Sequence, residues 1–143
     1  MDHVDYVYTT GMDDAEVDSH LREGTDAVLA LADGDEAYAV PLSYHYDGDR
    51  LLLRVSTHDD DAEKRRFLET TDTATFALYT DSPEASWSIH VRGPIREWDG
   101  DPDETTINEW FPPFRLFDEA VEDVSFSLYE LGMETVIGRK RVV

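Results

Sequence analysis

Hydrophobic and polar positions alternate along most of the chain, which is the pattern of half-buried strands. The alternating segments end at Gly, Asp or Pro, the residues that commonly close strands. Strands are predicted over residues 27–32, 37–46, 50–56, 73–80, 87–98, 124–131 and 134–141. A weaker alternation over 4–10 indicates an opening strand. The pattern therefore predicts about seven strands in a mainly β, antiparallel protein.

Three segments have the spacing of helices instead. Asp13 is suited to cap the first helix, and Gly24 is suited to end it. Val17 and Leu21 then lie one turn apart on its inner face. The predicted helices cover residues 14–23, 62–70 and 108–121. The fold class is therefore α+β, with a dominant antiparallel sheet and a few short helices.

Glycine and proline mark the expected turns and irregularities. Asp-Gly-Asp sequences at 33–35 and 47–49 predict two hairpin turns. Pro41 interrupts a strand and cannot donate to a ladder, so it predicts a strand edge or a bulge. Gly93 and Pro94 predict a kink in the strand at 87–98.

Length, composition and charge limit the possible functions. The 143 residues, 41% of them hydrophobic, fit a single domain over 1–143 with one core. Asp and Glu number 33 against 12 Lys and Arg, which gives a net charge of -21. Because phosphates would be repelled, nucleic acids and anionic membranes are excluded as partners.

The acidic residues are spread over nearly every turn and polar face, and lysine occurs only at Lys64 and Lys140. At molar salt the Debye length falls to about 3 Å, so repulsion among surface carboxylates is screened. A halophilic archaeal source is therefore our hypothesis. The chain has no cysteine, no apolar N-terminal segment and no run as long as a membrane span, so we expect a cytoplasmic protein.

The start of the predicted helix at 62–70 is the strongest candidate for chemistry. Its backbone amides and Lys64, in the first turn, could hold a phosphate. Alternatively, the acidic residues at 59–61 cap the helix and pair with the basic residues at 64–66. The spacing alone leaves both interpretations open.

Other familiar catalytic or metal-binding patterns are missing from the sequence. The histidines are His3, His20, His45, His58 and His90. They do not form a pair with metal-ligand spacing, so no metal site is predicted. The serines at 43, 56 and 88 have no histidine at a spacing that indicates nucleophilic catalysis.

Several short motifs follow one another in a recognisable order. They are Ala-Val-Pro-Leu-Ser at 39–43, Asp-Gly-Asp-Arg at 47–50, Val-Ser-Thr at 55–57, Lys-x-x-x-Leu at 64–68, Trp-Ser at 87–88 and Ile-Gly-Arg at 137–139. In this order the chain resembles the pyridoxamine 5'-phosphate oxidase-like family of flavin-binding split β-barrels, particularly its small archaeal members. The resemblance implies an antiparallel split β-barrel with a few short helices.

The resemblance also implies a cofactor site. The matching positions are Ala39, Val40, Pro41, Leu42, Ser43, Val55, Ser56, Thr57, Lys64 and Ser88. In relatives, the strand matching 39–43 lies along the isoalloxazine ring of FMN, and the residues matching 55–57 and Lys64 approach the ribityl phosphate. Ser88 falls where relatives place a polar side chain against the flavin. Trp87 would line the ring of a partner subunit or belong to the core.

The function implied is that of a flavin-dependent oxidoreductase. Hydride or electrons would pass between flavin N5 and a small substrate, without a separate catalytic residue. Relatives hold the cofactor between two subunits, so a homodimer is implied. Relatives with true pyridoxamine phosphate oxidase activity carry an arginine where this chain has Tyr38 and a serine where it has Ala62. Vitamin processing is therefore not expected.

Three alternatives stay open beside FMN. A deazaflavin could occupy the same fold. Some split barrels handle heme, and here His58 or His90 would have to serve as the ligand. A dimeric barrel that binds no cofactor and acts through interactions is the third.

We expect the protein to need salt for its stability. Dialysis from molar salt into dilute buffer should unfold or aggregate it, because carboxylate repulsion is then unscreened. Circular dichroism and light scattering across a salt series measure this. A protein equally stable in dilute buffer would contradict the halophilic origin.

Overall fold

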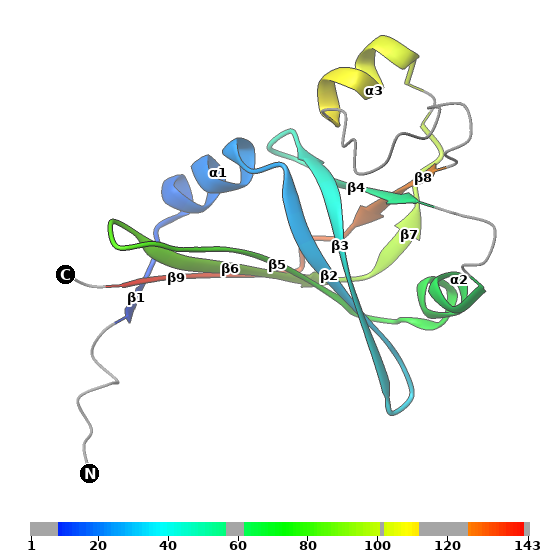
Figure 1. Ribbon diagram of the computed structural model, residues 1–143, viewed down its shortest axis with the longest axis horizontal. Helices are drawn as coiled ribbons and strands as arrows, with labels where there is room; N and C mark the ends of the chain where they lie inside the picture. The colour runs from blue at the N-terminus through cyan, green and yellow to red at the C-terminus, as the bar shows by residue number, and fades with distance from the viewer. Residues whose placement is uncertain (1–8, 57–61, 101, 112–125, 142–143) are drawn as a thin grey trace.

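The computed structural model describes residues 9–56, 62–100, 102–111 and 126–141 (Figure 1). Its elements are β1 (Thr9–Gly11), α1 (Asp14–Glu23), β2 (Asp26–Asp33), β3 (Glu36–Tyr46), β4 (Leu51–Ser56), α2 (Ala62–Thr70), β5 (Ala74–Asp81), β6 (Ser86–Gly93), β7 (Ile95–Glu97), α3 (Glu104–Trp110), β8 (Phe126–Leu131) and β9 (Thr135–Arg141). All strand pairs are antiparallel, in the order β1-β9-β6-β5-β2-β3-β4-β8-β7. The prediction of a mainly β, antiparallel protein with short helices is confirmed.

One bend turns this sheet back on itself. The β6–β9 pair continues into the β7–β8 pair, with the amide of Glu134 donating to the carbonyl of Arg92 (3.1 Å) and that of Gly132 to Pro94 (2.8 Å). Gly93 lies at the bend, where an added Cβ would stand 1.7 Å from the carbonyl oxygen of Gly132. Only glycine allows the two backbones to approach so closely. The sheet therefore curls into a barrel.

The barrel is split between β3 and β4. These strands pair only where Ser43–Tyr46 face Leu51–Arg54, and they separate beyond Ser43 and Arg54. Pro41 lies just past the last pair. The amide of Tyr44 donates to Thr25 of the segment before β2 (3.0 Å), so by alternation the nitrogen of Pro41 faces the split, where no donor is needed. The predicted strand edge at Pro41 is confirmed.

Helix α2 fills this split and contacts both of its sides. The ring of Phe67 stacks on Tyr38 of β3, with ring centroids 5.1 Å apart. Lys64 Nζ donates to the carbonyl of Ser56, the last residue of β4, at 2.9 Å. Thr71, just after α2, bonds the backbone of β2. The helix thus joins the two strands at the point where their ladder ends.

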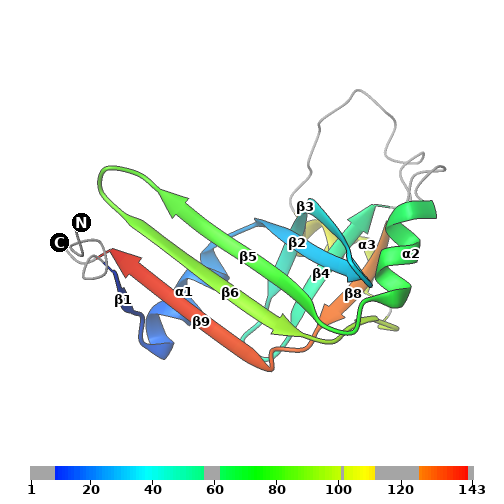
Figure 2. The ribbon, with the colours of Figure 1, turned by 90° about the horizontal axis from the view of Figure 1, so that it is seen from below.

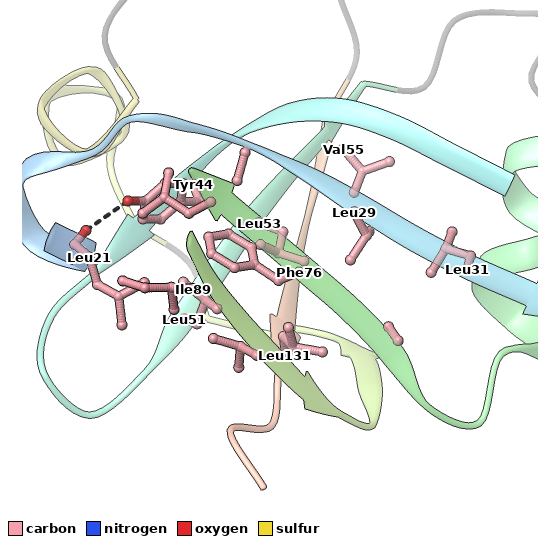
Figure 3. Packing of buried hydrophobic residues seen from close by; sticks show 14 of the residues in the cluster. Leu21, Leu29, Leu31, Tyr44, Leu51, Leu53, Val55, Phe76, Ile89 and Leu131 are labelled. Carbon is pink, nitrogen blue, oxygen red and sulfur yellow. Dashed lines mark hydrogen bonds between the residues drawn. The ribbon is translucent and has the colours of Figure 1, made fainter. Parts of the chain in front are cut away.

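The core lies inside the curled sheet and beneath α1 (Figure 3). Fully buried side chains include Leu21, Leu29, Tyr44, Leu51, Leu53, Phe76, Ile89 and Leu131. Each buried Leu or Phe contributes about 1.5–3 kcal/mol relative to exposure. The Tyr44 hydroxyl donates to the carbonyl of Leu21 at 2.8 Å, and burial raises the pKa of Tyr44, so the phenol stays a donor. This bond fixes the end of α1 to β3.

The predicted boundaries hold for most elements. Helix α1 begins with the expected Asp13 cap, reinforced by Glu16 in a capping box. Both Asp-Gly turns place glycine at positive φ, 60° at Gly34 and 99° at Gly48. Much of the predicted opening strand at 4–10 lies outside the described residues, and its described part is β1.

One boundary prediction is wrong. The third helix begins at Glu104, capped by Asp103, and not at residue 108. The Asp103 cap is a local signal that the prediction did not use. Residues 112–121 of the predicted helix lie outside the described part of the chain. The predicted kink at Gly93 and Pro94 is confirmed: it divides the predicted strand at 87–98 into β6 and β7, because Pro94 has no amide hydrogen for the ladder.

Replacement of Gly93 tests the bend. We expect Gly93→Ala to lower the free energy of unfolding by about 1–3 kcal/mol, because the methyl group would overlap a backbone oxygen. Gly11→Ala is the matched control, since the nearest atom to its Cβ would be 4.0 Å away. Denaturant titrations in molar salt measure both. Equal stability of the two variants would show that the close approach is unimportant.

Candidate functional site

The strands from β9 to β4 have one side against the core and one side turned away from it, which we call the outer face. In β2, Leu29 and Leu31 are buried in the core, so the alternate residues belong to the outer face. Figure 2 shows the outer face of β9, β6, β5 and β2 toward the viewer, with α1 behind the strands. Among the described residues, no helix covers this part of the outer face.

The strand register aligns outer-face residues in rows across the sheet. A middle row contains Ile137, His90, Ala77, Val28 and Pro41. One step along the strands, Asp26, Ser43 and Arg54 form what we call the polar row. One step in the same direction on β9, β6 and β5, the register pairs Ser88 with both Arg139 and Tyr79. Ala39 lies one step the other way.

The structure separates the predicted β3 residues into two groups. Ala39, Pro41 and Ser43 belong to the outer face, where small side chains leave the strand open to a flat ligand. Val40 and Leu42 are half-buried and pack against the core. Their side chains therefore support the strand, and only their backbone groups could contact a ligand on the outer face.

The predicted residues of the split corner lie around the start of α2. Ser56 is exposed at the end of β4, whereas Val55 is buried in the core. Lys64 is 9% exposed and reaches Ser56 through its ammonium group. Thr57 lies outside the described residues. Tyr38, where relatives carry an arginine, packs inward against α2.

In the alternative interpretation, Lys64 belongs to an acidic helix cap formed by residues 59–61. Residues 59–61 and His58 lie outside the described part of the chain. Arg66, one of the expected partners of these acids, lies 2.9 Å from Glu36 and 3.8 Å from Asp33. Its ion pairs therefore join α2 to the β2–β3 hairpin.

Ser88 lies at the opposite end of the outer face. Three strand spacings separate it from Ser43, about 14 Å. Ser88 lines a hollow of about 330 Å³ together with Tyr79, His90 and Arg139. A single chain therefore does not bring Ser88 into one compact pocket with the β3 strip.

Trp87 points the other way and packs against the core. Its ring stacks on His20 of α1, with centroids 3.9 Å apart and an interplanar angle of 23°. Trp87 is therefore a core residue in this chain. A second hollow, of about 500 Å³, lies between α1 and β9 and is lined by Met12, Val17 and Val136. Neither hollow contains the outer-face residues of β3.

Arg54 is a candidate that the sequence interpretation missed. It is the direct partner of Ser43 and belongs to the outer face, because Leu53 and Val55 on either side of it are buried in the core. Burial lowers the pKa of its guanidinium, which nevertheless stays charged at any physiological pH. Counting outward from the predicted Asp-Gly turn at 47–49 pairs Arg54 with Ser43, so the sequence contained this information.

Aromatic residues border the outer face beyond Arg54. His45 of β3 stacks on Trp110 of α3, with centroids 4.8 Å apart and an interplanar angle of 9°. Trp98 lies 6.0 Å from Trp110, and the guanidinium of Arg50 lies over Trp98. Burial lowers the pKa of His45, which favours its neutral form. Helix α3 thus borders the open surface on the β4 side of β3. The open surface consists of β3 and the strands β2, β5, β6 and β9.

Two classes of feature do not occur in the described part of the chain. No group of three His, Asp or Glu side chains there is placed to hold a metal ion. Within the same residues, no helix has the length and apolar character needed to cross a membrane.

The residues present fit a flavin. Ala39 and Pro41 offer a flat apolar strip, and Ser43 and Arg54 offer hydrogen-bonding groups at one end of it. At the split, Ser56 and the cationic Lys64 offer partners for a phosphate. The strip is open rather than concave, so a cofactor lying on it would need a further cover.

Comparisons with known proteins agree with this architecture. A candidate pyridoxamine 5'-phosphate oxidase from Corynebacterium glutamicum is 13% identical, with a TM-score of 0.69 over 100% of this chain and 97% of its own. An FAD-binding protein from Mesorhizobium loti is 18% identical, with a TM-score of 0.66 over 92% and 97%. The heme storage protein HutZ from Vibrio cholerae is 15% identical, with a TM-score of 0.61 over 86% and 92%. At these identities the likeness establishes the fold, an antiparallel split β-barrel.

The sequence itself identifies the family. The family model for pyridoxamine 5'-phosphate oxidase matches residues 13–140, which is most of the chain. The protein therefore belongs to the pyridoxamine 5'-phosphate oxidase family, and the resemblance inferred from its motifs is confirmed. A search of curated proteins found no match.

Proposed function

We propose that the protein binds FMN on the outer face of β3 and transfers hydride or electrons between the flavin and a small substrate. The observation that carries the proposal is the flat strip of Ala39 and Pro41, with Ser43 at one end and the Ser56–Lys64 corner beside it, across the split. The FAD-binding relative of the same fold supports the class of ligand. A deazaflavin has the same general shape and stays an alternative.

The residues of the chain would hold and orient the cofactor. Lys64 would place a positive charge beside the phosphate, where its bond to the Ser56 carbonyl holds the ammonium group. Ser43 and Ser56 would offer hydroxyl groups along the edge of the strip. The bound flavin itself supplies hydride transfer at N5, so the proposal needs no separate catalytic side chain.

The substrate is not expected to be pyridoxamine phosphate. Tyr38 is occupied by its stack on Phe67, so it cannot take the role of the arginine found in the oxidases proper. Ala62 offers no hydroxyl at the first position of α2. Compared with the oxidases proper, the chain thus retains the fold and one cation of the phosphate corner, Lys64.

We also propose a homodimer with the cofactor between subunits. Tyr79 and Ile137 are 67% and 51% exposed, and both lie on the outer face beside the hollow that contains Ser88. Exposed apolar side chains on an uncovered sheet favour contact with another protein surface. A second copy would supply the cover that the open β3 strip needs, and its Ser88 hollow could meet the cofactor.

Flavin titration of a matched pair of variants tests the cofactor proposal. Wild-type protein in molar salt should bind FMN and quench its fluorescence. Lys64→Met should weaken FMN by about 10-fold or more through loss of a charge-assisted bond, and should leave riboflavin binding unchanged. Arg65→Met removes the same charge from an exposed position of α2, so it should bind FMN normally.

Other results would point to the alternatives. Absence of FMN quenching in the wild-type protein would remove the flavin proposal and favour a barrel without a cofactor. A Soret band on addition of hemin, lost in His90→Ala, would favour the heme alternative, because His90 lines the hollow. Circular dichroism of every variant separates lost binding from lost folding.

Aspartate substitutions on the outer face of the sheet and on its α1 side test the proposed dimer. Ile137→Asp, on the outer face, should convert a dimer into a monomer, as should Tyr79→Asp. Val136→Asp is the control: Val136 is the next residue, 39% exposed, on the side facing α1. Light scattering coupled to gel filtration measures the mass of each. A monomeric wild type would contradict the proposal.

A further inference from the structure

The polar row joins a carboxylate, a hydroxyl and a guanidinium on three adjacent strands. Asp26 of β2 is the register partner of Ser43 of β3, and Ser43 is the partner of Arg54 of β4. The Ser43 hydroxyl donates to Asp26 Oδ1 at 3.2 Å. Side chains directly opposite on one face lie about 5 Å apart, so the three groups cover about 10 Å across the sheet.

The chemistry of the row is asymmetric. An ionised Asp26 can only accept hydrogen bonds, and Arg54 can only donate them. Ser43 between them can do both. A ligand edge that suits the row therefore carries a donor beside acceptors, with the donor toward Asp26 and an acceptor toward Arg54.

The row has a fixed place relative to the split corner. Arg54 and Ser56 belong to the same face of β4, two residues and about 7 Å apart. Lys64 marks the corner by its bond to Ser56. A ligand anchored by a phosphate at the corner, with its ring on Pro41, would direct the ring toward the row.

We propose that Arg54 and Asp26, with Ser43 between them, bind the pyrimidine edge of the isoalloxazine ring. This edge carries an N–H between two carbonyl oxygens, so the N–H can donate to Asp26 while a carbonyl oxygen accepts from Arg54. The inference rests on the proposed function and assigns it a ligand class, since flavins and deazaflavins share this edge and heme lacks it. Arg54 and Asp26 are thereby ligand-binding residues of this chain.

The surroundings of Arg54 strengthen the assignment. It is half-buried, and burial lowers the pKa of its guanidinium, so water is partly excluded around this cation. A hydrogen bond from a partly desolvated cation is stronger than one from an exposed cation. Arg54 is therefore placed to discriminate between ligand edges, while the exposed Asp26 adds the accepting group.

Binding of three ligands to three proteins tests the proposal. FMN, riboflavin and 3-methylriboflavin are titrated against wild type, Arg54→Gln and Asp26→Asn in molar salt. Arg54→Gln should weaken FMN and riboflavin by the same factor, about 10-fold, since the lost bond is to the ring. Methylation of N3 should weaken binding to wild type, and this penalty should shrink in Asp26→Asn.

A matched control and the opposing results make the test decisive. Arg50→Gln removes the same charge from the residue just before β4, where Arg50 lies over Trp98, and should bind all three ligands as wild type does. If Arg54→Gln weakens FMN alone, the arginine contacts the phosphate and the assignment is wrong. Unchanged binding in Arg54→Gln, or equal wild-type affinity for riboflavin and its 3-methyl form, would falsify it too.

Failure of the underlying function looks different. A wild-type protein that binds none of the three flavins removes both the proposed function and this inference. A wild-type protein that binds FMN and riboflavin, beside variants that do so equally well, removes only the inference. Thermal unfolding of each variant shows that the fold is retained.

Discussion

The separation of β3 from β4 beyond Ser43 and Arg54 is the constraint on which the rest of the structure depends. A sheet that stops pairing leaves backbone groups and an open end to the core, which must be satisfied or covered. Helix α2 does so with two contacts of different chemistry, the Phe67–Tyr38 stack and the Lys64–Ser56 bond. The candidate ligand strip lies beside these contacts, so the proposed binding would use residues that also stabilise the fold.

The charge of the chain adds a second constraint on this region. Several exposed cations pair with carboxylates: Arg22 lies 2.7 Å from Asp18, and Lys140 lies 2.7 Å from Glu16. Such exposed pairs contribute little to stability, about 0–1 kcal/mol each, and less at high salt. Arg54 and Lys64 differ in being partly or largely buried. In a protein with a net charge of -21, salt screens the attraction of such buried cations for an anionic ligand less than it screens that of exposed cations.

Local signals in the sequence were sufficient for the elements whose boundaries depend on local chemistry. The Asp13 cap predicted the start of α1, and the Asp-Gly turns predicted both hairpins, because these signals act within a few residues. The Gly-Pro pair at 93–94 likewise predicted the kink, but not the close approach of Gly93 to the carbonyl of Gly132, 39 positions away.

The candidate site was predictable in its strand but not in its orientation. The motif at 39–43 identified β3, yet only the position of the core separates Ser43, on the outer face, from Leu42 beneath it. Arg54 belongs to none of the recognised motifs and gains its interest solely from being the partner of Ser43. Cross-strand neighbours of a motif are therefore as informative as the motif itself.

The turn between β3 and β4 has a consequence for how this surface can change during evolution. Asp47 accepts bonds from the amides of Asp49 and Arg50, at 2.8 and 2.7 Å, and so fixes the hairpin register. A slip of β4 by one residue would exchange its two faces, moving Arg54 into the core and Leu53 out of it. The candidate ligand surface and the core are thus formed by alternate residues of the same strands. A change in this turn that shifted the register would therefore disrupt the core, whereas substitutions at every second position can alter the candidate surface without doing so.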